Sequence, residues 1–140
     1  MRIAIDENIS TQIASAIRFL SLQTPNMQID HVSDLYGPGV SDAEWIRRYS
    51  QSGGIYFISL DHGLNRSSAQ RADIRTYGVV GVLLPKSACS MKLFEKAAFL
   101  IRWFPLIEAH FIFCNKKAIR GQLYQTGRSW QPSAGMIRQI

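Results

Sequence analysis

The feature that most constrains the fold is a set of short apolar runs that end abruptly on an acidic residue. Ile3–Ile5 is followed at once by Asp6, and Ile55–Leu60 is followed by Asp61. Apolar runs of this length, bounded by polar residues, are typical of buried strands. Between them, apolar residues recur at helical spacing, first at Ile9, Ile13, Ala14, Ile17 and Leu20. Strands alternating with helices predict an α/β fold with a mostly parallel sheet and helices on both faces.

Capping and turn residues predict further elements of the first half. Ile29–Val32 and Val79–Leu84 are additional strand candidates. Ser41-Asp42-Ala43-Glu44 has the form of a capping box that opens a helix. Gly78 closes another helix over residues 67–76, because glycine readily adopts the left-handed conformation found after a helix.

The second half is predicted to continue with a long helix over Met91–Phe104. Pro105 is expected to kink or interrupt it, because proline lacks a backbone donor. His110–Cys114 and Ile119–Tyr124 are then expected to form two strands around a turn.

The length of 140 residues fits one domain. We assign residues 1–125 to it and expect residues 126–140 to form a basic, loose tail, since apolar residues are scarce there. Cys89 and Cys114 lack the spacing of a zinc site and are interpreted as reduced thiols. No uninterrupted apolar run approaches the ~20 residues of a membrane span. We therefore expect a cytoplasmic protein without membrane association.

Charge is unevenly divided along the chain. Residues 1–66 carry five basic and seven acidic side chains, whereas residues 67–140 carry eleven and three. The acidic half favours a site that concentrates carboxylates, and the basic half favours an anionic partner such as nucleic acid or phosphate.

The acids that follow strands form the candidate site. The carboxyl ends of parallel strands meet at one edge, so Asp6 and Asp61 are expected to lie there. Asp42, in the first turn of a helix, is expected at the same edge, although it and Glu44 also suit the helix dipole. Converging carboxylates favour a hard cation such as Mg²⁺ or Mn²⁺. The predicted metal ligands are Asp6, Asp42 and Asp61, with Glu7 as an additional candidate.

Three motifs together resemble the PIN-like domains, compact nucleases best known as toxins of bacterial toxin–antitoxin pairs. They are Asp6-Glu7-Asn8, the segment Ser41 to Ile46, and Ile58-Ser59-Leu60-Asp61. The resemblance covers roughly residues 1–85. It implies an α/β/α sandwich and a metal-dependent endoribonuclease in which a metal-bound water attacks an RNA phosphodiester, leaving a 5′-phosphate and a 3′-hydroxyl.

By matching position, the resemblance implies that Asp6, Asp42 and Asp61 are the catalytic acids. The partners it implies are an RNA substrate and a small antitoxin protein; a homodimer is a further expectation. One departure is Gly63, where relatives often carry a second acid. It keeps open a non-catalytic nucleic-acid-binding module of the same fold.

A second alternative is a receiver-like phosphoacceptor domain. Asp6, Asp61 and Lys86 mimic its acid and lysine set, although Lys86 follows Pro85 where receivers place lysine before proline.

A candidate RNA surface is expected from cations interleaved with the aromatic residues Tyr124 and Trp130. Cations can contact phosphates, and aromatic rings can stack on unpaired bases. The predicted RNA-binding residues are Arg66, Lys116, Lys117, Arg120 and Arg128.

Overall fold

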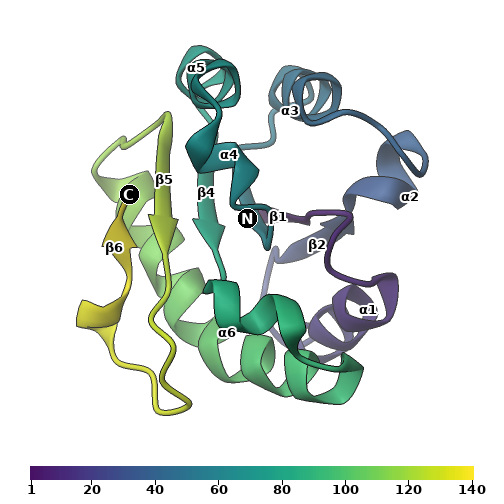
Figure 1. Cartoon of the computed structure of the whole chain (residues 1–140), viewed down its shortest axis with the longest axis vertical. Coiled ribbons are helices and arrows are strands. Elements are labelled where there is room, and N and C mark those ends of the chain that lie inside the picture. Colours follow the sequence, from purple (N-terminus) through teal and green to yellow (C-terminus); the bar gives the residue numbers. More distant parts are fainter.

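Five short parallel strands and one antiparallel edge strand form the centre of the molecule (Figure 1). The structure is a computed structural model that describes residues 1–140, the side chain of Ala134 excepted. The sheet has the order β2-β1-β3-β4-β5-β6. The strands are β1 (Arg2–Ile5), β2 (Gln28–His31), β3 (Tyr56–Ser59), β4 (Val80–Leu83), β5 (Gln122–Gln125) and β6 (Arg138–Gln139).

Helices cover both faces of this sheet, which confirms the expected three-layer α/β/α sandwich (Figure 1). Helices α1 and α6 lie on one face, and α3 and α5 lie on the other. The helices are α1 (Thr11–Leu20), α2 (Val32–Tyr36), α3 (Asp42–Gln51), α4 (Gly63–Arg66), α5 (Ser68–Tyr77) and α6 (Leu93–Lys116), with short 3-10 turns η1 (Lys86–Ser90) and η2 (Ala134–Met136).

The alternation of side chains along each strand divides the core between the two faces. Ile3 and Ile5 point towards α1 and α6, while Ala4 between them joins the cluster under α3. Likewise, Phe57 belongs to the cluster under α3, and Ile58 belongs to the cluster under α1 and α6. The central strands β1, β3 and β4 are buried on both faces and carry apolar residues at most positions, as buried parallel strands do.

The predicted helix ends are confirmed at α3 and α5. Ser41 caps α3 by accepting a hydrogen bond from the Glu44 amide at 3.2 Å, and Ser67 caps α5 by accepting one from Gln70 at 3.3 Å. Gly78 ends α5 with φ of +69°, a conformation that glycine adopts without strain. These caps set where α3 and α5 begin, close to the carboxyl ends of the strands.

Helix α6 is longer than predicted, and the expected strand over His110–Cys114 is wrong. The helix runs through Pro105 to Lys116. Its buried residues recur every fourth position, at Phe99, Trp103, Ile107 and Phe111, and their packing on the sheet outweighs the single backbone bond that Pro105 removes.

By length and composition alone, α6 is also apolar enough to cross a membrane. In the folded chain, its buried face belongs to the core cluster that includes Ile3, Ile5 and Ile58. Core helices of globular proteins can be equally long and apolar.

Residues 126–140, assigned above to a tail, contain the last strand. β6 pairs with β5 through Gln125 and Arg138, and the Trp103 indole donates a 2.9 Å hydrogen bond to the Ser129 carbonyl. Trp130 packs edge-on against Phe99 at 5.2 Å.

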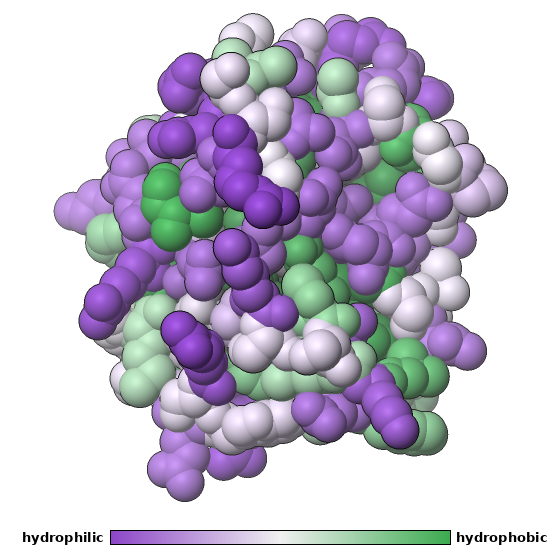
Figure 2. Space-filling model, in the orientation of Figure 1, coloured by the Kyte–Doolittle hydropathy of each residue, from purple (hydrophilic) through white to green (hydrophobic). Residues whose placement is uncertain are grey.

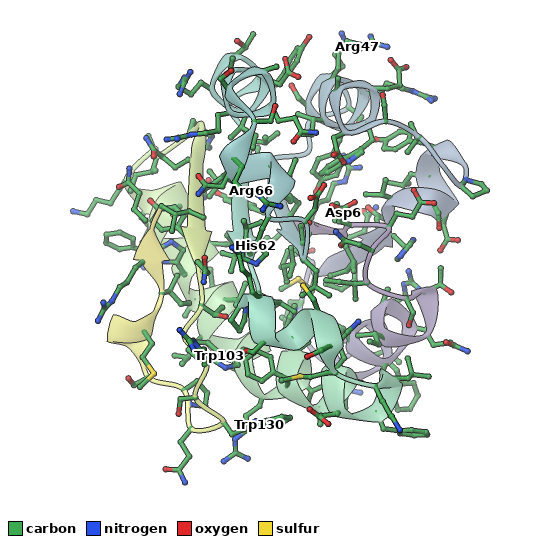
Figure 3. The ribbon with its side chains drawn as sticks, in the orientation of Figure 1. Asp6, Arg47, His62, Arg66, Trp103 and Trp130 are labelled. Carbon is green, nitrogen blue, oxygen red and sulfur yellow. The ribbon has the colours of Figure 1, made fainter. Side chains whose placement is uncertain are left out.

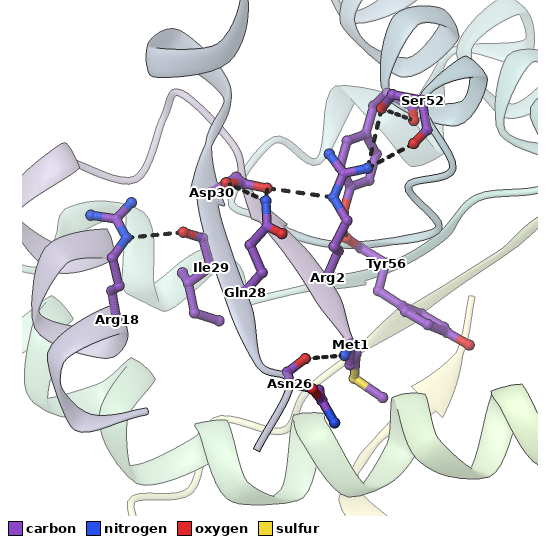
Figure 4. A network of polar contacts seen from close by, with 10 residues as sticks. Met1, Arg2, Arg18, Asn26, Gln28, Ile29, Asp30, Ser52 and Tyr56 are labelled. Atoms are coloured by element: carbon purple, nitrogen blue, oxygen red, sulfur yellow. Dashed lines mark hydrogen bonds and ion pairs between the residues drawn. The ribbon is translucent and has the colours of Figure 1, made fainter. Parts of the chain in front are cut away.

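A polar network closes the amino ends of β1 and β2 (Figure 4). The Arg2 guanidinium donates to the Ser52 carbonyl at 2.9 Å and lies 3.7 Å from Asp30. Gln28 donates to the same Asp30 carboxylate at 2.9 Å. These contacts join the Asp30 carboxylate to Arg2 and Gln28, the first residues of β1 and β2.

Candidate functional site

The three predicted acids Asp6, Asp42 and Asp61 meet at one open pocket of about 300 Å³. It lies at the carboxyl ends of β1 and β3, where the chain leaves one half of the sheet for the other. Ligands of open parallel sheets bind at such a switch point. The pocket is lined by Asp6, Glu7, Asn8, Val40, Asp42 and Asp61.

Asp6 is the most deeply buried of these acids, with 4% of its surface exposed. Its carboxylate accepts a 2.6 Å hydrogen bond from the Ser59 hydroxyl and a 2.7 Å bond from the Glu7 amide. Burial, with a smaller contribution from the negative charges of Asp42 and Asp61, raises the pKa of Asp6 to about 6, although the Ser59 and Glu7 hydrogen bonds lower it. The site therefore holds a carboxyl group whose charge is costly without a cation.

Asp42 is held by two donors from the helices on the α3–α5 face. The Trp45 indole donates to it at 3.0 Å, and the Gln70 amide donates at 2.9 Å. Burial raises the pKa of Asp42, and the neighbouring Asp61 carboxylate adds to the rise. Because the two donors come from α3 and α5, the position of Asp42 depends on how these helices pack together.

Asp61 is oriented by the turn that follows β3. Its carboxylate accepts a 2.8 Å bond from the Gly63 amide, and its own amide donates to the Ser59 hydroxyl at 2.9 Å. A Cβ atom at Gly63 would lie 2.8 Å from the Asp61 carboxylate oxygen, so any larger residue would displace that oxygen. The present orientation of Asp61 therefore depends on glycine at position 63, where relatives often carry an acid.

Glu7 and Asn8 complete the wall of the pocket. Glu7 accepts a 2.7 Å bond from the Gly39 amide and so ties the loop before α3 to the end of β1. The Asn8 side-chain oxygen accepts a 3.1 Å bond from the Leu60 amide. Both residues connect β1 to segments that carry the other two acids.

The donor chemistry of this pocket fits a hard divalent cation, since carboxylate oxygens are the ligands that Mg²⁺ and Mn²⁺ prefer. Within the part of the chain that the structure describes, however, no group of three His, Cys, Asp or Glu side chains is already arranged to hold a metal. Asp42 accepts hydrogen bonds from the Trp45 indole and the Gln70 amide, and Asp61 accepts one from the Gly63 amide.

The predicted RNA-binding residues are divided between two edges of the sheet. Arg66 ends α4 directly after Asp61, and Arg128 follows β5, so both lie at the edge of the acidic pocket. Lys116, Lys117 and Arg120 lie between the end of α6 and the start of β5, at the opposite edge. The Tyr124 ring is buried against His110 at 4.2 Å and offers no stacking surface, whereas Trp130 is 41% exposed.

Ser59, Gln70 and Trp45 position the acids but were not among the predicted site residues. Ser59 is fully buried and connects Asp6 to the Asp61 amide. A lone serine inside an apolar strand was the available signal for it. Figure 3 shows Asp6, His62 and Arg66 on the same face. His62 is engaged elsewhere, because its ring donates to the Leu84 carbonyl at 2.8 Å.

Comparison with models of protein families gave a match. The family model described as "PIN like domain" matches residues 1–86, the segment that contains all four acidic residues of the pocket. No curated protein and no solved structure matched the chain. The match leaves the receiver-like alternative without support. The chain therefore belongs to the PIN-like domain family, which has a nuclease-type fold.

Proposed function

We propose that the protein is a divalent-metal-dependent ribonuclease and acts as the toxin of a type II toxin–antitoxin pair. PIN-like domains are typically nucleases and generally use divalent metals. The observation that carries the proposal is the pocket at the β1–β3 switch point, where the charges of Asp42 and Asp61 help to raise the pKa of Asp6 to about 6. A bound cation offsets such repulsion.

Asp6, Asp42 and Asp61 would hold the cation, and Mg²⁺ or Mn²⁺ would supply activation of water and neutralise charge on the phosphodiester. The chain itself supplies their orientation. The Ser59 hydroxyl orients the Asp6 carboxylate by a hydrogen bond, and the Gln70 and Trp45 side chains orient Asp42 in the same way. Glu7 keeps the loop at Gly39 against the pocket.

The test is cleavage of single-stranded RNA with added Mg²⁺ or Mn²⁺. We expect cleavage that EDTA stops and that Asp6→Asn reduces by at least about 100-fold, because the substitution removes a charge from the metal site. Asp73→Asn is the matched control, since Asp73 lies on α5 outside the pocket lining, and it should cleave like the wild type. Equal activity of Asp6→Asn and wild type would contradict the proposal.

The toxin role has its own readout in living cells. Induced expression in a bacterial host should arrest growth with the wild-type chain and not with Asp6→Asn. A small antitoxin would then relieve the arrest. Growth that is unaffected by a chain active on RNA would leave a ribonuclease without the toxin role.

A second candidate function is that of a non-catalytic nucleic-acid-binding module. It is favoured by Gly63, which stands where relatives often carry a second acid. Salt-sensitive RNA binding that survives Asp6→Asn, with no cleavage by the wild type in either metal, is the outcome it expects.

A further inference from the structure

The edge that carries the acidic pocket continues into a basic region. Lys86 follows β4, Arg128 follows β5, and Arg138 begins the antiparallel strand β6 beside Gln125. Acids therefore occupy the β1–β3 part of the edge, and cations occupy the β4–β6 part. Hydrophilic residues dominate the face that contains α4 and β5 (Figure 2).

Two adjoining pockets open among these cations, and they share Gln125. One, of about 260 Å³, is lined by Gln125, Thr126, Gly127, Met136, Arg138 and Ile140. The other, of about 330 Å³, is lined by Pro85, Lys86, Ser87, Gln125 and Arg128. Neither lining includes an Asp or Glu side chain, so the polar groups present suit an anion.

Thr126 gives an independent indication of a ligand. The residue is 3% exposed, and its hydroxyl has no hydrogen-bond partner among the described residues. A buried hydroxyl without a partner is unfavourable, because it has lost its hydrogen bonds to water without a replacement. An anion seated in the pocket would accept a hydrogen bond from this hydroxyl and remove the cost.

The cations around the two pockets are free to bind. In the part of the chain that the structure describes, the ion pairs are Arg2–Asp30 and Arg47–Glu44, so Lys86, Arg128 and Arg138 pair with no carboxylate. All three side chains are exposed. Arginine forks and lysine ammonium groups are the side chains that bind phosphate oxygens most readily.

The basic pockets are connected to the acidic pocket through the end of β4. The Thr126 amide donates to the Leu83 carbonyl at 3.0 Å, and the ring of His62, next to Asp61, donates to the Leu84 carbonyl at 2.8 Å. Only β4 separates β3 from β5, so these two strands lie about 10 Å apart at a strand spacing of about 4.8 Å. That separation is short enough for one nucleic-acid strand to reach both.

We propose that Lys86, Thr126, Arg128 and Arg138 form a phosphate subsite that holds the backbone of single-stranded RNA beside the acidic pocket. The inference rests on the proposed function for the identity of the strand. It assigns a role to Lys86, Thr126 and Arg138, and it separates Arg128 from Lys116, Lys117 and Arg120. Phosphate contacts position a strand without reading its sequence, so the subsite is expected to act on RNAs of any sequence.

The test measures binding of a short labelled single-stranded RNA by fluorescence anisotropy in EDTA, so that cleavage plays no part. Lys86→Ala/Arg128→Ala should weaken binding by about 10-fold or more and lower the slope of log K against log salt by about 1.4, near 0.7 for each lost contact. Lys96→Ala/Arg102→Ala removes the same charge from α6, outside the linings of these pockets, and should change binding less than about twofold.

Thr126→Val distinguishes a ligand contact from a structural role. Because the hydroxyl has no partner within the described chain, valine should leave the melting temperature unchanged or higher while weakening RNA binding. A valine variant that melts lower and binds RNA normally would show a structural role and overturn the assignment. Competition with inorganic phosphate is a second measurement on the wild-type chain. If phosphate displaces the labelled RNA at concentrations at which other anions do not, free phosphate is the ligand and the RNA assignment is overturned.

The failures of the two proposals can be told apart. Tight, subsite-dependent RNA binding without metal-dependent cleavage would support the subsite and reject the ribonuclease. Metal-dependent cleavage with an unchanged KM in Lys86→Ala/Arg128→Ala would support the ribonuclease and reject the subsite. If Lys116→Ala/Lys117→Ala weakens binding and Lys86→Ala/Arg128→Ala does not, the strand binds at the opposite edge and the subsite is wrong.

Discussion

Asp6 combines deep burial with a carboxylate that must be charged to hold a cation. Burial raises its pKa from 3.8 to about 6. Below about pH 4 the group is protonated in both the folded and the unfolded chain, so it neither adds to nor subtracts from stability relative to a neutral side chain. Between about pH 4 and 6 the unfolded chain has released this proton while the folded chain still holds it, so stability falls as pH rises through that range. Above about pH 6 the group is charged in both states and the loss of stability is complete.

Asp6→Asn should therefore raise the free energy of unfolding at pH 7, by up to about 3 kcal/mol at 1.36 kcal/mol per pKa unit. The amide can accept from the Glu7 amide and donate to the Ser59 hydroxyl, so it suits the same two partners. The gain should shrink as pH falls through 6 and vanish near 4. Urea denaturation in EDTA at several pH values measures it, with Asp73→Asn as the control. A gain independent of pH would contradict the assigned burial cost.

At the residue scale, Asp6 and Asp61 could be predicted because an acid that follows a buried parallel strand lies at the carboxyl edge of the sheet, and Asp42 could be predicted from its place in the first turn of a helix. The groups that orient them could not. Ser59 and Gln70 contact Asp6 and Asp42 across 53 and 28 residues of sequence. A lone serine in an apolar strand marks Ser59 as unusual, but nothing local to Ser59 or Gln70 identifies the acid that each one contacts.

At the scale of elements, β3 and β4 are joined by a contact that only glycine allows. Gly81 lies opposite Phe57 in the register, and a Cβ atom there would come within 2.2 Å of the Phe57 ring. The ring occupies the place of the missing side chain and packs edge-on against Trp45 at 5.3 Å. The pairing of these strands sets the position of Asp61 relative to β4.

Gly81→Ala should consequently lower the free energy of unfolding by about 1–3 kcal/mol or more, because the core would be overpacked. Phe57→Leu makes room for the methyl group, so the double variant should be more stable than the sum of the two single changes predicts. Chemical denaturation of all four chains gives the coupling energy. Strictly additive effects would show that the ring and the methyl group do not meet.

The error over His110–Cys114 also belongs to this scale. A short apolar run of this kind fits a strand or a buried helix equally well, and periodicity alone does not separate them. The deciding contacts, such as the 4.9 Å packing of Phe111 against Tyr56, come from a strand more than fifty residues earlier. The local sequence around Phe111 does not indicate that it packs against so distant a residue.

For the whole molecule, cation binding should appear as stability. An ion that binds the folded chain alone stabilises it by about 2.7 kcal/mol at one hundred times its Kd. Saturating Mn²⁺ should accordingly raise the melting temperature by roughly 5–10 °C for a domain of this size. EDTA should reverse the shift, and Asp6→Asn should abolish it. A wild-type melting temperature that is indifferent to both Mg²⁺ and Mn²⁺ would argue against a metal site.

The division of charge along the chain could be predicted, but its division in space could not. Lys117 and Arg128 are close in sequence, yet β5 runs between them and carries them to opposite edges of the sheet. Lys117 and Arg128 were predicted to share one RNA-binding surface because they are close in sequence, but the fold places them at opposite edges of the sheet. Conversely, the antiparallel turn of β6 brings Arg138 back beside Gln125.

Helix α6 has a consequence for the timing of protein synthesis. Its residues from Phe99 to Phe111 supply most of the cover for one face of the sheet. Before α6 has been synthesised, Ile3, Ile5 and Ile58 can pack on this face against α1 but lack the larger part of their cover. The acidic residues are made first, and we expect the pocket that they form to become stable only after α6 has been added.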